Sequence, residues 1–380
     1  MDGEVCVFDI WGGMTVMSEK NLYEKLKGRN IIVYGAGFVG KAMIGYLRGS
    51  NVMLRGIADR NDKLKDEFKQ IGLDVCPIEV WRELEPDATI LLAVGEKHRD
   101  QLWNNCKIVG FSNIVTITDE DLQNAIKWNV ESYLRKKDIQ TDGEYLSFGK
   151  LKVLNPLKFE NRRDQYLYLT ELCDFILPTQ DETWNIINEG PYDWGNAILE
   201  HGDVVLDCGA NMGLFSTYAA QKGCTCYAFE PFPELKETIE KMCEINEVSI
   251  NLVSAAVSNA TGMATFSVGY NNTAGSLVKG ASEEGTIKVQ TVSIDEFVEK
   301  EGLSSVDYIK ADIEGAERLM LQGAQNTLAK FGPKLAICTY HLPDDKEVLT
   351  KLILQANPRY QIEYKWQKLY ARIPDNGTQC

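Results

Sequence analysis

The sequence lacks several features that would point to particular classes of protein. No apolar run approaches the roughly 20 residues that a membrane-spanning helix requires. Basic residues are in the minority, with 40 Lys and Arg against 55 Asp and Glu, and a net charge of -15 would repel a nucleic-acid backbone or an anionic membrane surface. The first residues include Asp2 and Glu4, where a secretory signal would carry basic side chains. We therefore expect a cytoplasmic protein whose partners are neither nucleic acid nor membrane.

Close groups of metal-ligating or disulfide-forming residues are also scarce. The chain holds ten cysteines and three histidines, and the cysteines are scattered along its length. Cys224 and Cys226 form a close pair whose spacing places both side chains on one face of an expected strand, without a second Cys or His pair nearby. Scattered cysteines within expected strands are typical of buried side chains in a reducing compartment. We predict no metal site.

The order of apolar segments and glycine turns predicts an α/β protein with two doubly wound, Rossmann-like units. A length of 380 residues exceeds what one hydrophobic core usually organises, and the pattern of strand, glycine turn and helix occurs twice. We expect the first unit over residues 21–118 and the second over 189–373. Between them, residues 119–188 contain few glycine turns and show helical spacing over 160–177 and 181–188, which predicts a helical connector.

The first unit carries a turn that is typical of dinucleotide sites. A strand over 30–34 leads into Gly35-Ala36-Gly37-Phe38-Val39-Gly40, and a second strand ends at Asp59. Spacing and context match the fingerprint in which glycines approach a pyrophosphate and an acid holds a ribose, which taken literally predicts NAD binding. The region has no convincing Tyr/Lys pair or Cys for hydride transfer, however, and it resembles the small Rossmann-like domains attached to some bacterial sugar-modifying transferases. We therefore favour a nucleotide or sugar site, or a structural role, over redox chemistry.

Two elements of the second unit predict a nucleoside cofactor. The segment 204–213, Val-Val-Leu-Asp-Cys-Gly-Ala-Asn-Met-Gly, places Asp207 at the end of a buried strand, before glycines that let the backbone approach a ligand. It lacks the Gly-Lys-Ser/Thr ending of a triphosphate loop. The next strand ends at Glu230-Pro231, where an acid can bind both hydroxyls of a ribose. Sites for NAD and for S-adenosylmethionine share this pair, so the pair alone does not choose between them.

A third element favours S-adenosylmethionine. The segment 306–317 is a strand that delivers Asp312 to the carboxyl edge of the sheet, followed by an acidic helix start with Glu314 and Glu317. Taken alone, Asp312 could simply cap that helix. In this order, however, the glycine loop and the acidic segment resemble those of the FkbM family of S-adenosylmethionine-dependent methyltransferases. The resemblance covers 189–373 and implies a class I methyltransferase sheet with seven strands, one of them antiparallel.

The resemblance also implies an activity and roles for individual residues. The activity is O-methylation of a hydroxyl on a sugar or another small polyhydroxylated metabolite, with Asp312 and Glu314 beside the methyl group and the acceptor. The sequence departs from the commonest form of the family at Ala311, where a branched residue is usual, so the packing behind Asp312 is expected to differ. The implied cofactor-binding residues are Asp207, Gly209, Ala210, Asn211 and Gly213 in the loop, Glu230 and Pro231 at the ribose, Ala255 and Ala256 near the adenine, and Asp312.

Methyl transfer from a sulfonium requires alignment of the reacting atoms and removal of a proton from the acceptor. Partial burial of the neighbouring acids Asp312, Glu314 and Glu317 is expected to raise the pKa of one of them towards the working pH. His341, just beyond a central strand and with an intrinsic pKa of about 6.5, is the rival base. We predict Asp312, Glu314 and His341 as the catalytic residues. The alternative functions are an NAD-dependent oxidoreductase that uses the first unit and a non-catalytic nucleotide-binding protein.

Overall fold

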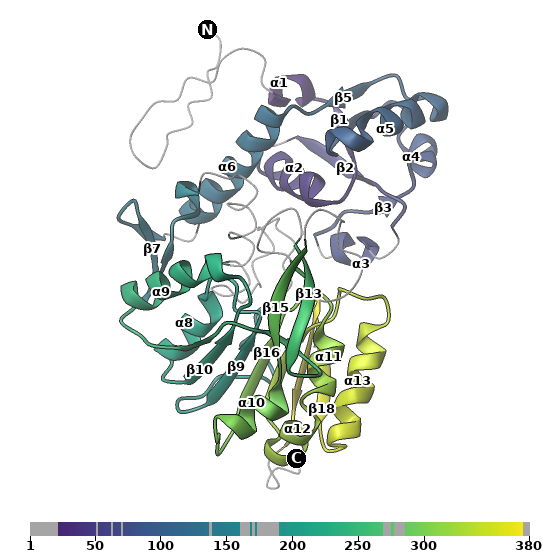
Figure 1. The fold of residues 1–380 in the computed structure, drawn as a ribbon. Coiled ribbons are helices and arrows are strands. Elements are labelled where there is room, and N and C mark those ends of the chain that lie inside the picture. Colours follow the sequence, from purple (N-terminus) through teal and green to yellow (C-terminus); the bar gives the residue numbers. More distant parts are fainter. Residues whose placement is uncertain are drawn as a thin grey trace. The chain divides into compact units, whose positions relative to one another are not determined.

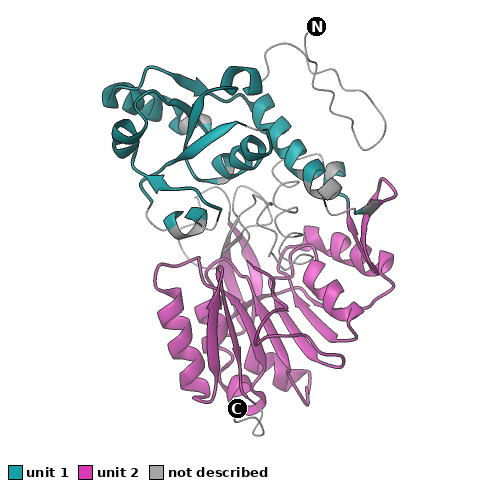
Figure 2. Ribbon diagram, turned by 180° about the vertical axis from the view of Figure 1, so that it is seen from behind, with its two compact units in different colours: residues 1–140, 155–173, 179–188 teal, residues 141–154, 174–178, 189–380 magenta. Residues whose placement is uncertain are grey.

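The chain forms two compact units, which the computed structural model places at residues 1–140, 155–173 and 179–188 for unit 1 and at 141–154, 174–178 and 189–380 for unit 2 (Figure 2). The structure describes residues 22–50, 52–61, 64–69, 71–136, 139–159, 168, 172, 190–268, 275–276 and 286–374. Among these residues, no helix combines the length and the apolar character that crossing a bilayer demands.

Unit 1 is built on a parallel sheet of five strands in the order β3-β2-β1-β4-β5 (Figure 1). The chain leaves β1 towards β2 and β3 and then returns to the other side of β1 to form β4. This reversal makes the carboxyl ends of β1 and β4 the topological switch point, where ligands of open α/β sheets usually bind. The strands are β1 (Asn30–Tyr34), β2 (Met53–Ala58), β3 (Val75–Cys76), β4 (Thr89–Leu92) and β5 (Ile114–Thr116).

Helices cover both faces of this sheet, as the nearly continuous apolar strands require. Ile31 and Val33 face a core shared with α1, α2, α3 and α6, whereas Ile32 and Tyr34 face a second core shared with α4 and α5. This alternation follows from the two-residue period of a strand. The helices are α1 (Leu22–Leu26), α2 (Phe38–Gly49), α3 (Leu64–Lys69), α4 (Ile78–Leu84), α5 (Glu96–Val109) and α6 (Asp119–Lys136).

The segment expected to be a helical connector differs from that prediction in two ways. Its first helix, α6, packs against α2 within unit 1, where the Asn129 amide donates a hydrogen bond of 2.8 Å to the Ala42 carbonyl. Its next part forms a three-stranded sheet of β6 (Gln140–Thr141), β7 (Tyr145–Phe148) and β8 (Leu151–Leu154). The helices predicted over 160–177 and 181–188 lie outside the described residues, apart from Tyr168 and Leu172.

The strands β7 and β8 form a hairpin because their sequence alternates. Leu146, Leu151 and Val153 are buried, and Phe148 pairs with Leu151 across a two-residue turn at Gly149, whose φ of 61° favours glycine. Asn246 at the end of α9 (Lys236–Ile245) holds the hairpin: it accepts a hydrogen bond from the Lys152 amide and donates one to the Lys152 carbonyl, both of 2.8 Å. The hairpin therefore belongs to unit 2 and packs against α9.

Unit 2 contains a seven-stranded sheet in the order β11-β10-β9-β16-β17-β19-β18 (Figure 1). Only β19 runs against the direction of the other six, because it pairs antiparallel with both of its neighbours. This topology agrees with the α/β methyltransferase sheet that the resemblance implied. Its strands are β9 (Val204–Cys208), β10 (Thr225–Phe229), β11 (Asn251–Val253), β16 (Tyr308–Ala311), β17 (Lys334–Cys338), β18 (Gln361–Lys365) and β19 (Lys368–Arg372).

The sheet of unit 2 is also buried on both faces. Leu206, Ile309 and Ile337 belong to a large core on one face, and Val205 and Tyr308 belong to a core on the other. The helices of this unit are α8 (Leu214–Gln221), α9, α10 (Ile294–Lys300), α11 (Glu317–Gln322), α12 (Gln325–Phe331) and α13 (Asp345–Ala356). A smaller sheet, in the order β12-β15-β13-β14, contains β12 (Ala256–Ser258), β13 (Gly262–Val268), β14 (Gly275–Ser276) and β15 (Thr286–Ser293).

Candidate functional site

The predicted glycine loop lies between the carboxyl ends of β10 and β16. The amides of Gly209 and Ala210 donate hydrogen bonds of 3.1 and 3.0 Å to the Phe229 carbonyl at the end of β10. Gly209 has a φ of 83°, and a Cβ there would collide with the carbonyl oxygen of Asp312. Glycine is therefore required at this position, both for its conformation and for the close approach. The loop and the acidic segment are far apart in the sequence, but their backbones touch at Gly209 and Asp312.

Asp207 lies behind the loop rather than on its surface. Its side chain is fully buried, accepts a hydrogen bond of 2.6 Å from the Ser216 hydroxyl, and lies 3.1 Å from the ammonium of Lys310. The same ammonium donates a hydrogen bond of 2.5 Å to the carbonyl of Gly209. Burial opposes the charge of Lys310, but the carboxylates of Asp207 and Asp312 outweigh it and raise the pKa of the lysine. This buried ion pair supports the glycine loop from below.

Glu230 is positioned by the backbone around it. It follows β10 directly, is 6% exposed, and accepts hydrogen bonds from the amides of Asn211 at 2.9 Å and Phe232 at 3.0 Å. Burial raises the pKa of Glu230 to about 7, although these two amide donors and Lys310 act against it. The carboxyl group therefore titrates near neutral pH and lies beside Asn211, which has a positive φ of 49°.

The other residues predicted to surround a cofactor lie around the same edge of the sheet. Gly213 has a φ of 79° and precedes α8, and a Cβ there would press on Ile239 of α9. Pro231 is half-buried, whereas Ala255 and Ala256 are buried beyond the end of β11. The amides of Glu230 and Ala255 both donate a hydrogen bond to the Val253 carbonyl. The residue predicted to bind the ribose and a residue predicted to lie near the adenine therefore share one backbone acceptor.

Asp312 follows β16 and is surrounded by cationic and polar groups. Its side chain is 25% exposed and accepts a hydrogen bond of 2.6 Å from the Tyr192 hydroxyl. The ammonium groups of Lys368 and Lys310 lie 4.1 and 5.1 Å from the centre of the Tyr192 ring. Burial alone would raise the pKa of Asp312, but Lys310, His341 and Lys368 together with the Tyr192 hydroxyl lower it. Asp312 is therefore a carboxylate at neutral pH.

Asp312 does not cap the helix that follows it. The helix α11 begins at Glu317 after Ala316, and no side chain caps it. Instead, the Glu317 carboxylate accepts a hydrogen bond of 2.9 Å from the amide of Ile313. The capping role that the sequence left open for Asp312 is thus wrong, because Asp312 lies too early in the chain to reach the first turn.

His341 lies within a group of three acids. Its Nδ1 is 3.1 Å from Glu317, and its Nε2 is 3.5 Å from Glu314 and 3.8 Å from Asp312. Burial lowers the pKa of the imidazole, but the carboxylates outweigh burial and raise it to about 9. This pKa favours a protonated His341 at neutral pH, and the role of His341 as a catalytic base stays a prediction. Glu314, with a φ of 53°, is 41% exposed in its side chain.

The same acids and histidine are also a donor set that metal ions use. In the described part of the chain, ligand atoms of Asp312, Glu317 and His341 lie within 4.8 Å of one another, although the sequence predicted no metal site. The protonated imidazole of His341 supplies the positive charge that faces these carboxylates.

Three residues that contact or surround the acids of this site were not predicted from the sequence. Lys310 sits between Ile309 and Ala311 in a fully buried strand, and a lysine in such a strand is itself a signal for a buried acid. Tyr192 and Lys368 carried no comparable signal, because they come from a turn before β9 and from the antiparallel strand β19. Ala311 is fully buried in the large core of unit 2, and the expected difference in packing behind Asp312 stays a prediction.

Comparisons with known proteins agree with this arrangement. Residues 207–363 match the family model of the methyltransferase FkbM domain. The chain is 26% identical over 189 residues to the hexuronic acid methyltransferase AglP of Haloferax volcanii, a match that covers 48% of this chain and 76% of the relative. It is also 26% identical over 160 residues to the 31-O-demethyl-FK506 methyltransferase FkbM of Streptomyces tacrolimicus, over 34% of this chain and 62% of the relative.

Among solved structures, the chain is similar to the methyltransferase FkbM of Methylobacillus flagellatus KT, with a TM-score of 0.41, 17% identity and coverage of 93% of each chain. The family model coincides with the part of the chain that holds the glycine loop, Glu230 and Asp312. Residues 207–363 therefore match the methyltransferase FkbM domain, and these matches support a methyltransferase activity.

Proposed function

We propose that the protein transfers a methyl group from S-adenosylmethionine to a hydroxyl of a sugar or another small polyhydroxylated metabolite. The observation that carries this proposal is the meeting of the glycine loop, Glu230 and Asp312 at the carboxyl edge of one parallel sheet. The names of two sequence relatives, one a hexuronic acid methyltransferase and the other a 31-O-demethyl-FK506 methyltransferase, favour an acceptor of this kind.

The residues at this edge fit a nucleoside cofactor. Each oxygen of Glu230 accepts one backbone amide, which fixes the carboxylate and leaves further lone pairs for the two hydroxyls of a ribose. The loop backbone around Asn211 would lie against the methionine part, and Asp207 would hold that backbone through Lys310 without touching the cofactor. In this proposal the cofactor-binding residues are Gly209, Ala210, Asn211, Gly213, Glu230, Pro231, Ala255, Ala256 and Asp312, with Asp207 as their buried support.

The bound cofactor would supply an activated methyl group, so the chain mainly has to orient the acceptor and manage one proton. Asp312 is an ionised, partly exposed carboxylate, and it can accept a hydrogen bond from the acceptor hydroxyl. A hydroxyl oxygen becomes strongly acidic as it gains a methyl group, so a carboxylate with a low pKa is a sufficient base late in the transfer. The Tyr192 hydroxyl holds Asp312 in place, His341 lies 3.8 Å from the same carboxylate, and Glu314 is exposed enough to contact an acceptor.

This function is tested by incubating the protein with isotopically methyl-labelled S-adenosylmethionine and a panel of hexuronic acids, neutral sugars and their glycosides. We expect mass spectrometry to find the label on a hydroxyl oxygen of at least one of them. Matched acceptors in which every hydroxyl is already methylated serve as the control. Label found only on nitrogen, carbon or a carboxyl group would contradict the proposed methylation of a hydroxyl.

Glu230→Gln should weaken the binding of S-adenosylhomocysteine. The amide keeps the volume of the side chain but loses one acceptor oxygen and the charge, which costs roughly 1.5–3 kcal/mol for hydrogen bonds to a charged group, or about ten- to a hundredfold in affinity. Isothermal titration calorimetry measures the effect directly. Glu234→Gln, four residues further on and exposed, is the control and should bind as the unaltered protein does.

The same carboxyl group makes this binding depend on pH. Since the pKa of Glu230 is raised to about 7, its carboxylate is mostly ionised at pH 8 and mostly protonated at pH 6. Ribose hydroxyls donate to the ionised form, so affinity should fall by about tenfold from pH 8 to pH 6. This dependence should disappear in Glu230→Gln. An equal dependence in both proteins would assign it to another group, including the amino group of the ligand.

A further inference from the structure

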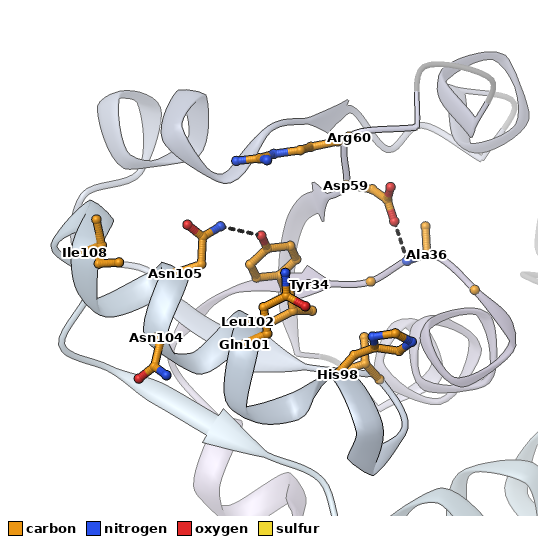
Figure 3. Close-up of a pocket in the computed structure, with 13 residues that line it drawn as sticks. Tyr34, Ala36, Asp59, Arg60, His98, Gln101, Leu102, Asn104, Asn105 and Ile108 are labelled. Carbon is orange, nitrogen blue, oxygen red and sulfur yellow. Dashed lines mark hydrogen bonds between the residues drawn. The ribbon is translucent and has the colours of Figure 1, made fainter.

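A cavity of about 670 Å³ lies in unit 1, and all of the residues that line it belong to this unit (Figure 3). It sits at the switch point of the five-stranded sheet, where the carboxyl ends of β1, β2 and β4 meet one face of α5. Its volume is within the range of sites for small molecules and cofactors. The cavity is lined by Tyr34, Gly35, Ala36, Gly37, Asp59, Arg60, Val94, His98, Gln101, Leu102, Asn104, Asn105 and Ile108.

The glycine turn after β1 gives this cavity an open backbone wall. A Cβ on Gly35 would lie 2.5 Å from the Val94 side chain, and a Cβ on Gly40 would collide with the Gly35 carbonyl, so these two glycines allow the turn to pack against β4 and α2. Gly37 differs, because a Cβ there would meet nothing within 4 Å. It precedes α2 without any side-chain cap, so the first amides of this helix are open to an anionic ligand.

Asp59 is fixed at the edge of the same cavity. Its Oδ2 accepts a hydrogen bond of 3.0 Å from the Ala36 amide, and its Oδ1 accepts one of 2.9 Å from the Asn61 amide. Figure 3 shows the carboxylate turned towards the glycine turn. Each oxygen retains acceptor capacity, so the carboxylate is positioned to receive the two hydroxyls of a ribose.

The opposite wall is rich in polar side chains that can form hydrogen bonds. His98, Gln101 and Asn105 follow one another at spacings of three and four residues and therefore share one face of α5. The Asn105 amide donates a hydrogen bond of 2.8 Å to the Tyr34 hydroxyl, which fixes its orientation. Arg60 lies across the cavity from Gln101 (Figure 3) and pairs with Glu79 at 2.8 Å on an exposed surface. This wall can bind a base or a sugar, and Arg60 can supply positive charge for a phosphate.

We propose that this cavity binds a nucleoside diphosphate, either alone or as part of a sugar nucleotide or dinucleotide. The diphosphate lies on the turn around Gly37, the ribose lies on Asp59, and the rest of the ligand extends along the amide face of α5, on the side towards which Arg60 points (Figure 3). The described residues that line the cavity include no Lys or Cys, and the Tyr34 hydroxyl accepts a hydrogen bond from Asn105. The proposal is therefore one of binding and includes no hydride transfer.

Gly37→Ala tests the proposal without disturbing the fold. Gly37 has a φ of -72°, which alanine adopts readily, and the new methyl group points into open space. It would occupy the place of the diphosphate, so binding should weaken at least tenfold while the melting temperature stays the same. Gly95→Ala is the matched control: Gly95 precedes α5, has a φ of -64° and also has nothing within 4 Å of its Cβ, but it does not line the cavity.

The full chain is titrated with ADP, UDP, UDP-glucose, NAD and inorganic pyrophosphate, with saturating S-adenosylhomocysteine present to keep nucleosides out of unit 2. Saturable binding of at least one nucleotide, lost in Gly37→Ala and kept in Gly95→Ala, supports the proposal, and the tightest probe identifies the form of the ligand. Asp59→Asn should weaken the nucleotide but not pyrophosphate. Equal nucleotide binding in the two glycine variants, or no binding of any probe at millimolar concentration, would overturn the proposal whether or not methyl transfer is found.

Discussion

Asp312→Asn is expected to lower methyl transfer by roughly 10²- to 10⁴-fold, the range for loss of a positioned acid or base. Asparagine keeps an oxygen for the Tyr192 hydroxyl, so the local hydrogen bond of 2.6 Å should remain. It cannot take up the acceptor's proton, and it removes a negative charge beside the cationic donor. Turnover is measured on the acceptor identified with labelled cofactor, and S-adenosylhomocysteine binding and the melting temperature are measured in parallel.

Asp344→Asn is the control for the loss of an acid near this edge. Asp344 is 60% exposed and pairs with Arg318 at 2.6 Å, but Arg318 keeps its second partner, the buried Asp345, at 2.8 Å. We expect full activity in this variant. A stable Asp312→Asn protein with undiminished methyl transfer would show that Asp312 is not the base, and the role would pass to Glu314, which is the more exposed acid.

The strands and loops of both units follow from local patterns in the sequence. The segments 204–208 and 30–34 are apolar, are followed by glycines and are buried on both faces, so their patterns predict parallel strands without knowledge of the rest of the chain. Glu230 and Asp312 were found in the same way, because each directly follows such a strand. The carboxyl ends of neighbouring parallel strands meet at one edge, and the sequence alone therefore places these acids together.

The charge state of the site could not be predicted in this way. The pKa of His341 depends on Glu317, the first residue of α11, and the pKa of Asp312 depends on Lys368 from an antiparallel strand. Both dependences arise from side-chain distances that only the folded chain defines. The hairpin at 145–154 was missed for a different reason: its alternating residues lie in a segment whose remaining parts suggested a helix, and a short alternating run carries little weight.

Lys310→Met is expected to destabilise unit 2 by about 3–5 kcal/mol, the cost of leaving one member of a buried ion pair without its partner. Asp207 is fully buried and would retain only the Ser216 hydroxyl, and the Gly209 carbonyl would lose its donor. Methionine preserves most of the volume, so the loss reflects charge rather than a cavity. Hydrogen exchange of the amides of β9 and β16 reports this unit separately from unit 1.

Lys241→Met is a control with the same geometry on the surface. Lys241 and Glu244 also lie 3.1 Å apart, but their side chains are 44% and 72% exposed, so solvent screens the pair and stability should not change. The double variant Asp207→Asn/Lys310→Met removes both buried charges and should recover a large part of the loss. If it were instead as unstable as the sum of its single variants, the two charges would not be coupled. Lys310 would then stabilise the loop through the Gly209 carbonyl alone, and the buried acid at the end of β9 would need another explanation.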